Sequence, residues 1–271
     1  MKRLFVSILV LVSLGSLPAN AQTPSDDPAA LKLAEPDFTV IALPTSLRLP
    51  KFGSAFRVTH RFTRPLSCDA CTTNLLEDFF GLDAGAIIGL EYRIGIVPNG
   101  QIGILRTGNK TIEFFGQYAA VRQSAGAPLD VSGIFTIEGT NNFRDSYSPA
   151  VGAIVGRTVG DVAAFYVEPI WVNNTNTLPK QVADDNNTFI IGLAARVRIR
   201  PTVYLVGEAA PRAGFKPGVT YGSFGIEKRA GGHMFQLNFS NAFGTTMAQI
   251  ARGGPAEKDW YLGFNITRKF Y

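Results

Sequence analysis

The chain has 271 residues and a formal net charge of +5, with 28 Gly, 20 Phe and 8 Tyr but only 17% charged residues. It contains no run of Lys or Arg, so the sequence gives no reason to expect a nucleic-acid-binding protein. Small residues, aromatic residues and sparse charge are typical of a sheet with one face in lipid, although an exported β-sandwich would share the aromatic residues.

The first 21 residues have the organisation of a secretory signal peptide. Lys2 and Arg3 precede an apolar run over residues 4–17, and Ala19-Asn20-Ala21 forms a cleavage site. This run is shorter than the roughly 20 residues that a transmembrane helix requires. We expect export and cleavage after Ala21. Residues 22–51, rich in Pro, Ala and Asp, then predict a mostly irregular N-terminal lead in the periplasm.

Twelve amphipathic strands are expected between residue 52 and the C-terminus. The first alternates apolar and polar residues over 56–63, so it has one face of each kind. The others are expected at 84–95, 101–107, 111–122, 128–139, 149–159, 162–172, 188–199, 202–210, 218–229, 233–241 and 260–270. Most of these segments are close to the roughly 9–11 residues of a tilted membrane strand.

The connections between these strands alternate in length. Short turns with Gly or Pro, such as Asn99-Gly100, alternate with connections that are mostly long and polar, such as residues 64–83 and 242–259. This asymmetry is typical of an outer-membrane barrel with short periplasmic turns and longer extracellular loops. The sequence therefore predicts an all-β fold over residues 52–271. That fold is a transmembrane antiparallel up-and-down β-barrel of about 12 strands, and an exported β-sandwich is the alternative.

The last strand ends the chain on aromatic residues. Its apolar face carries Leu262, Phe264, Ile266 and Phe270, interrupted by Arg268. Charge near the membrane interface costs only about 0–1 kcal/mol, so Arg268 is compatible with a closing strand. We expect the barrel assembly machinery to bind this strand, with an assembly signal formed by Phe264, Ile266, Phe270 and Tyr271.

Four stretches carry a resemblance to a known family. They are Thr59-His60-Arg61-Phe62, FFGLDAGAIIGLEYRI from Phe79 to Ile94, TIEFFGQYAAVRQ from Thr111 to Gln123, and FNITRKF from Phe264 to Phe270. From about Leu43 onward the chain resembles an uncharacterised family of predicted bacterial outer-membrane β-barrel proteins, a domain of unknown function. The resemblance implies a barrel in the outer membrane and brings no activity, ligand or catalytic residue.

Charged residues on the polar strand faces are expected to line the lumen, because Arg or Lys on the lipid face costs about 2–4 kcal/mol at the midplane. One interpretation is a salt-bridged network that fills a narrow barrel. The other is a polar pathway with a basic stripe at residues 196, 198 and 200, which would favour small anions. The candidates are Arg57, Arg61, Glu91, Arg93, Glu113, Asp130, Glu138, Arg196, Arg198, Arg200 and Glu208, and Glu168, Glu227 and Lys269 share their face.

The cysteines and histidines are weaker candidates for chemistry. Cys68 and Cys71 are expected to form a disulfide in an exported protein, with C-x-x-C redox chemistry as the alternative. His60 and His233 share strand faces with Phe residues, and neither has the serine two positions away that an outer-membrane phospholipase would place there. The sequence therefore predicts no catalytic residue, no metal site and no cofactor.

Three classes of function remain open from the sequence. The leading hypothesis is a narrow channel or binding barrel for a small polar solute, because the inward face is polar. The alternatives are a structural or interaction barrel with a plugged lumen and, less favoured, a membrane-embedded lipid hydrolase. Outer-membrane lipid is an expected partner in each case, and nucleic acid is not.

Overall fold

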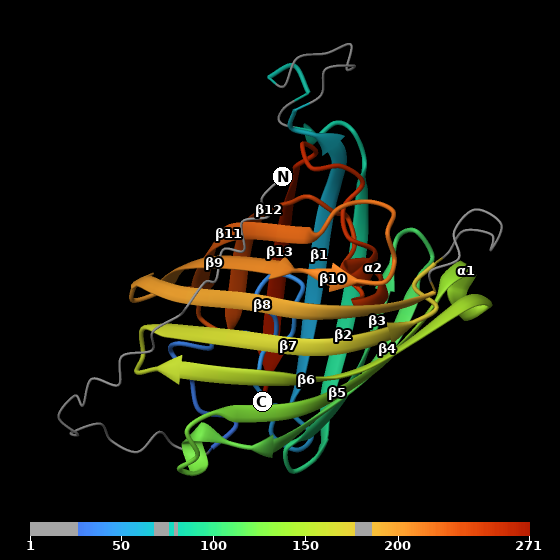
Figure 1. Ribbon diagram of the computed structural model, residues 1–271. Coiled ribbons are helices and arrows are strands. Elements are labelled where there is room, and N and C mark those ends of the chain that lie inside the picture. Colours follow the sequence, from blue (N-terminus) through green and yellow to red (C-terminus); the bar gives the residue numbers. More distant parts are fainter. Residues whose placement is uncertain (1–26, 68–75, 79–80, 177–185) are drawn as a thin grey trace, which may run out of the picture.

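The computed structural model describes residues 27–67, 76–78, 81–176 and 186–271 (Figure 1). Within them, twelve antiparallel strands close into a barrel, because β1 pairs with β2 on one side and with β13 on the other. The strands are β1 (Ser54–Pro65), β2 (Ala86–Val97), β3 (Gly100–Thr107), β4 (Ile112–Val121), β5 (Asp130–Gly139), β6 (Asp145–Val159), β7 (Ala163–Asn173), β8 (Asn187–Arg200), β9 (Val203–Ala210), β11 (Tyr221–Ala230), β12 (His233–Ser240) and β13 (Tyr261–Phe270).

Three short elements accompany these strands. The two-residue strand β10 (Arg212–Ala213) pairs with β8 beyond the end of β9. Helix α1 (Thr140–Phe143) lies between β5 and β6, and helix α2 (Met247–Arg252) lies between β12 and β13. A 3-10 turn occupies Gln123–Ala125. No helix in the described ranges is long and apolar enough to cross a membrane, a finding that does not bear on spanning by strands.

The twelve expected strands are confirmed, with ends that differ by four residues or fewer, and among the described residues β10 is the one additional strand. The alternation that predicted them also sets which face points inward. On β13, Tyr261, Asn265 and Thr267 are buried, whereas Phe264 and Ile266 point outward. Because the sheet closes on itself, the β-sandwich alternative is wrong.

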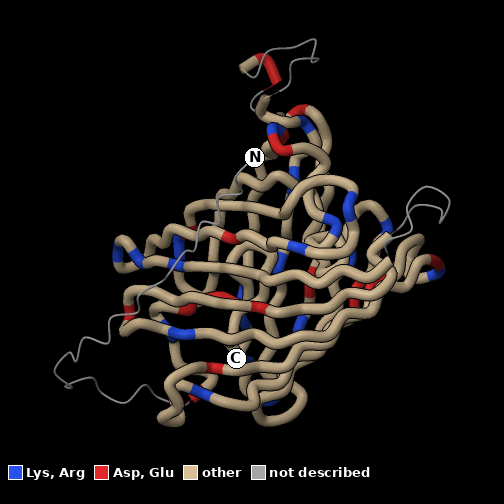
Figure 2. The backbone as a smooth tube through the Cα atoms, viewed as in Figure 1, with Lys and Arg blue, Asp and Glu red and all other residues tan. Residues whose placement is uncertain are grey.

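The outer face of the barrel is apolar over most of its strands. Phe114, Phe135, Trp171, Phe224 and many other large apolar side chains are exposed there. Charged residues are sparse along the strands, as Figure 2 shows. A contiguous apolar face of this extent is unusual for a soluble monomer and matches the surface that a barrel presents to lipid.

Two segments from opposite ends fill the barrel lumen. We call residues 34–49 the lumen hairpin and residues 241–254, which include α2, the lumen loop. All sixteen residues of the lumen hairpin are buried, so the expectation that this lead lies in the periplasm is wrong for residues 34–49. The lumen loop was expected to be an outer loop, but most of it is buried inside the barrel. In each case burial of apolar side chains against the wall supplies the reason.

The lumen hairpin enters and leaves at the end of the barrel that carries the short turns. There, the Phe52 amide donates to the Gly95 carbonyl at 2.7 Å, and Arg48 contacts Asn99 of the β2–β3 turn. Inside, Thr39 and Pro44 bridge each other rather than a wall strand, and the Val40 amide donates to the Leu43 carbonyl at 2.9 Å. The tip of the hairpin is therefore Ile41-Ala42, in the interior of the barrel.

Candidate functional site in the barrel lumen

Glu208 of β9 holds the tip of the lumen hairpin through backbone amides. Its carboxylate accepts from the amides of Ile41, Ala42 and Leu43, the last two at 2.8 and 2.9 Å. Three consecutive amides converge on one group because the chain turns at the tip, which forms a concave anion-binding arrangement. The Tyr221 hydroxyl donates to the same carboxylate at 3.0 Å. Glu208 is thus the main anchor of the tip.

Wall side chains also satisfy the carbonyl groups of the tip. The Ile41 carbonyl accepts from Arg57 Nη2 at 2.8 Å and from Asn265 Nδ2 at 2.9 Å. Gln236 donates to the Val40 carbonyl at 2.6 Å, and Arg196 donates to the Thr39 carbonyl at 2.7 Å. Buried backbone groups require such partners. The wall therefore binds the main chain of the hairpin tip, and these contacts do not depend on the side chains of the tip.

The stem of the hairpin is held by its side chains. The Phe38 ring lies beneath two cations, with the Arg93 guanidinium carbon 4.8 Å and the Lys269 ammonium 5.2 Å from its centroid. Glu35 accepts from the Ser46 and Tyr166 hydroxyls, both at 2.8 Å. Burial raises the pKa of the Glu35 carboxyl above its usual value. The stem is consequently tied to β2, β7 and β13.

Ion pairs join side chains of the wall around the hairpin, both between strands and within one strand. Glu91 of β2 pairs with Arg57 of β1 at 3.0 Å and with Arg93 of its own strand at 2.5 Å. Arg196 of β8 pairs with Glu227 of β11 at 2.7 Å, and both side chains are fully buried. These pairs agree with the interpretation of a salt-bridged network. They also leave Arg196 neutralised rather than free to attract an anion.

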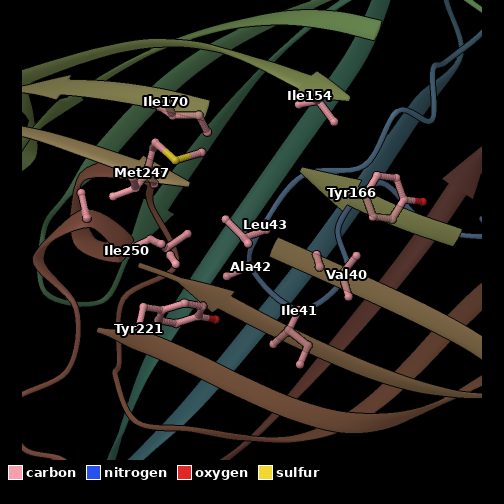
Figure 3. Packing of buried hydrophobic residues seen from close by; sticks show 14 of the residues in the cluster. Val40, Ile41, Ala42, Leu43, Ile154, Tyr166, Ile170, Tyr221, Met247 and Ile250 are labelled. Atoms are coloured by element: carbon pink, nitrogen blue, oxygen red, sulfur yellow. The ribbon is translucent and has the colours of Figure 1, made fainter. Parts of the chain in front are cut away.

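The lumen loop is attached to the wall from the long-loop end. Thr246 begins α2 with a capping box shared with Gln249. The Met247 amide donates to Glu113 at 2.8 Å, and Arg252 pairs with Glu138 at 2.7 Å. The apolar side of α2 then faces the tip of the hairpin, and Figure 3 shows Met247 and Ile250 in one cluster with Ala42 and Leu43.

A small cavity remains between the two inserted segments. Its volume is about 40 Å³, enough for a few water molecules. It is lined by Thr39, Ala42 and Pro44 of the hairpin, Thr245, Met247 and Ile250 of the loop, and Arg57, Glu91, Arg93, Leu105, Glu113, Phe115, Gln117, Ile134 and Thr136 of the wall. Little free space therefore remains at this point between the hairpin tip, the lumen loop and the wall.

The lumen candidates from the sequence fall into two groups. Arg57, Arg61, Glu91, Arg93, Glu113, Asp130, Glu138, Arg196 and Glu208 are all buried and face inward. Arg198 is half-buried, and Arg200 is exposed at the short-turn end of β8. The predicted basic stripe thus leaves only Arg196 inside the lumen, because the other two positions lie where β8 emerges from the barrel.

The remaining candidates lie away from the lumen. His60 stacks on Phe264 with ring centroids 4.7 Å apart, and His233 contacts Arg268 at 2.9 Å, both on outward-facing positions. Phe264 and Ile266 are partly exposed on the outer face, and Phe270 and Tyr271 are exposed at the short-turn end. Cys68 and Cys71 lie outside the described residues.

Several wall residues that contact the inserted segments carry no charge, and the charge pattern did not single them out. Gln117 donates to the Thr45 carbonyl at 2.8 Å, and Gln101 both accepts from the Leu49 amide and donates to the Leu47 carbonyl. Gln236 and Asn265 bind the tip. The two-residue alternation that selected the charged candidates also places these four amides on the inward face, so that signal could have found them.

The chain belongs to the family described as membrane bound beta barrel domain (DUF5777), which matches residues 37–270. The match begins within the lumen hairpin, so it covers residues 37–49 of the hairpin, including the tip, together with the barrel wall. The resemblance expected from the sequence is thereby confirmed. No curated protein matches the chain.

Two solved structures share the fold at low sequence identity. An outer membrane channel from Pseudomonas putida F1 is 11% identical, with a TM-score of 0.50 over 82% of this chain and 97% of that one. The NanC porin is 6% identical, with a TM-score of 0.53 over 81% of this chain and 99% of that one. The protein is therefore a membrane-bound β-barrel with the architecture of these channels.

Proposed function

We propose that this protein is an outer-membrane channel for a small polar solute, and that the lumen hairpin closes it in the present structure. The observation that carries the proposal is the chemistry of the wall beneath the hairpin. Glu208, Arg57, Asn265 and Gln236 point inward and are satisfied by the main chain of the tip. Without the hairpin these groups would be hydrated and would line a polar passage.

The attachment of the hairpin supports its role as a movable closure. It belongs to no wall strand, since Thr39 and Pro44 bridge each other. It is also continuous with the barrel at the short-turn end alone, through residues 50–53. Withdrawal toward that end would break hydrogen bonds to side chains and leave the barrel ladder intact. The two structural neighbours are described as an outer membrane channel and a porin, which agrees with this function.

A second candidate is a barrel that stays plugged and serves an interaction or structural role. The filled lumen favours it, because about 40 Å³ of free space separates the two inserted segments. The two candidates differ in one measurable property. A channel requires the hairpin to leave its place, whereas a permanently plugged barrel does not.

A disulfide between the hairpin and the wall tests this difference. A Cβ atom at Gly156 of β6 would lie 3.3 Å from the Cβ of Ser46, close to the roughly 3.5–4.5 Å spacing of a disulfide. The variant combines Ser46→Cys and Gly156→Cys in a Cys68→Ser/Cys71→Ser background. Refolded protein is placed in a planar bilayer, and conductance is measured before and after reduction. Ser46→Cys alone in the same background is the matched control.

We expect the oxidised double variant to be silent and its reduced form to conduct. The conductance of the control should be the same before and after reduction. A folded barrel that stays silent in both states, with a silent control, would refute the channel and support the plugged barrel. Equal conductance in both states would show that solute passes without movement of the hairpin, and the hairpin would then not be the closure.

A further inference from the structure

An apolar groove crosses four neighbouring strands on the outer face of the barrel. It lies over β9, β11, β12 and β13, which follow one another in the wall (Figure 1). Its volume is about 490 Å³, so it can accommodate a flexible hydrocarbon chain. We call it the outer groove. Its apolar lining consists of Val203, Ile226, Phe235, Leu237, Phe264 and Ile266.

Two cations lie on the outer face toward the short-turn end of this groove. Lys228 of β11 is part of its lining, and Arg268 of β13 follows Ile266 by two residues. Both side chains are exposed. Within the described ranges, neither forms an ion pair with an acidic side chain. Their charges are therefore available to a group outside the protein, near the membrane interface where long cationic side chains are tolerated.

Strand register brings the two cations close to each other. Lys228 pairs with Phe235 of β12. Arg268 pairs with His233, two residues before Phe235 on the same strand. With strands about 4.8 Å apart and a rise of about 3.4 Å per residue, the Cα atoms of Lys228 and Arg268 are about 12 Å apart. A phosphate group midway between them, about 6 Å from each Cα, is within reach of both long side chains.

The Arg268 side chain extends toward Lys228. Its Nη1 lies 2.9 Å from His233 Nε2, and β12, which carries His233, is the strand between β13 and β11. The His233 ring in turn stacks on Phe235, with ring centroids 5.8 Å apart. Arg268 is thus held over the strand that separates it from Lys228, beside the apolar lining of the outer groove.

A second groove on the outer face has no such cations. It crosses β2 to β6, its volume is about 430 Å³, and the described residues that line it, from Ile96 to Gly152, include no charged residue. An apolar groove for lipid chains is therefore compatible with this barrel without any charge beside it. Lys228 and Arg268 indicate a more specific occupant for the outer groove.

We propose that the outer groove binds one anionic phospholipid from the membrane leaflet at the short-turn end. An acyl chain lies against the apolar lining, and the phosphate pairs with Arg268 and Lys228 through charge-assisted hydrogen bonds. A zwitterionic phospholipid binds less tightly, because the two cations repel its ammonium group. The site is on the outer face, so it does not depend on the proposed channel function.

Native mass spectrometry of the full-length refolded protein in detergent measures binding of a single lipid. The two probes are phosphatidylglycerol and phosphatidylcholine with identical acyl chains. One cation near an anionic head group contributes a factor of about five in affinity, which corresponds to about 1 kcal/mol. With two cations, we expect phosphatidylglycerol to bind about 25-fold more tightly than phosphatidylcholine.

Single substitutions assign this preference to the two cations. Lys228→Gln and Arg268→Gln should each weaken phosphatidylglycerol binding about fivefold and leave phosphatidylcholine binding unchanged. Both residues are exposed, so neither substitution is expected to prevent folding, which migration before and after heating checks. Arg157→Gln is the matched control. Arg157 is an exposed cation near the short-turn end of β6, five strands from β12 in the ring, and its loss should not change the preference.

A soluble competitor separates a lipid site from a site for free phosphate. Glycerol 3-phosphate carries the phosphate without acyl chains, and at equal concentration it should displace no lipid. Displacement would show that the site binds phosphate alone, and the lipid proposal would be wrong.

Three other results would also overturn the proposal. They are equal binding of the two lipids, a preference that survives both Lys228→Gln and Arg268→Gln, and a loss in Arg157→Gln as large as in those two variants. The last result would mean that the net charge of the barrel, rather than the outer groove, attracts the lipid. None of these results bears on the channel.

Discussion

Removal of the Glu208 carboxylate should release the lumen hairpin. Three backbone amides, from Ile41, Ala42 and Leu43, donate to this carboxylate in the closed lumen. A hydrogen bond to a charged group contributes about 1.5–3 kcal/mol. The three donors share one acceptor and do not add independently, so we take about 3 kcal/mol for the set. Glu208→Ala should therefore raise the population of the withdrawn hairpin about 100-fold.

A cysteine at the hairpin tip reports this population. Ala42 is 6% exposed, so an Ala42→Cys side chain in the Cys68→Ser/Cys71→Ser background should react slowly with a water-soluble maleimide. We expect labelling about 100-fold faster when Glu208→Ala is added, in proportion to the withdrawn fraction. Glu208→Gln should have a smaller effect, because its amide oxygen still accepts and its amide nitrogen can donate to Tyr221 or Ser223.

The control for this series is Glu257→Ala, which removes an exposed loop carboxylate far from the hairpin in sequence. In this control, the Ala42→Cys side chain should react with the maleimide at the same rate as in the parent. Labelling of Glu208→Ala at the rate of the parent, in a barrel that still shows heat-dependent migration, would mean that three unsatisfied buried amides have no effect on docking, and Glu208 would then not hold the hairpin.

Two further predictions concern the wall and the stem of the hairpin. A Cβ atom at Gly103 would lie 2.2 Å from Phe115 Cζ and 2.7 Å from the Tyr92 carbonyl oxygen, whereas one at Gly133 meets nothing within 4 Å. Gly103→Ala should thus lower the free energy of unfolding by about 1–3 kcal/mol in urea titrations, and equal stability of Gly103→Ala and Gly133→Ala would contradict this. Burial raises the pKa of Glu35 above 4.5, so the docked stem binds a proton more tightly than the withdrawn one. Docking should weaken and conductance should rise as pH increases above 4.5, and a pH response that persists in Glu35→Gln would exclude this carboxyl as its source.

The barrel wall could be predicted from the sequence because its signal is local. Residues such as Phe264, Asn265 and Ile266 alternate between lipid and lumen, and the alternation holds whatever lies inside the barrel. The alternation of short turns and long loops could be predicted for the same reason, because it follows from the lengths of the connections between the strands. The inward direction of Arg57, Glu91 and Glu208 followed from the cost of charge in lipid.

The content of the lumen could not be predicted in this way. Residues 34–49 carry Val40, Ile41, Leu43 and Leu47, more apolar side chains than a solvated lead requires, but no local pattern says where they are buried. The Met247–Arg252 helix is short, and the sequence of its loop has no distinct helical periodicity that would predict it. Both segments were therefore expected outside the barrel.

By itself the sequence determined a twelve-stranded wall, the face of each strand and the residues whose charge must avoid lipid. Only the tertiary structure decided that the lumen hairpin and the lumen loop are buried inside the barrel. The physical reason is the range of the contacts. Strand alternation acts between neighbours, whereas the bonds from Ile41 and Leu43 to Glu208 join groups more than 160 residues apart. Such contacts depend on the tertiary arrangement, because only the folded barrel brings β9 beside the hairpin.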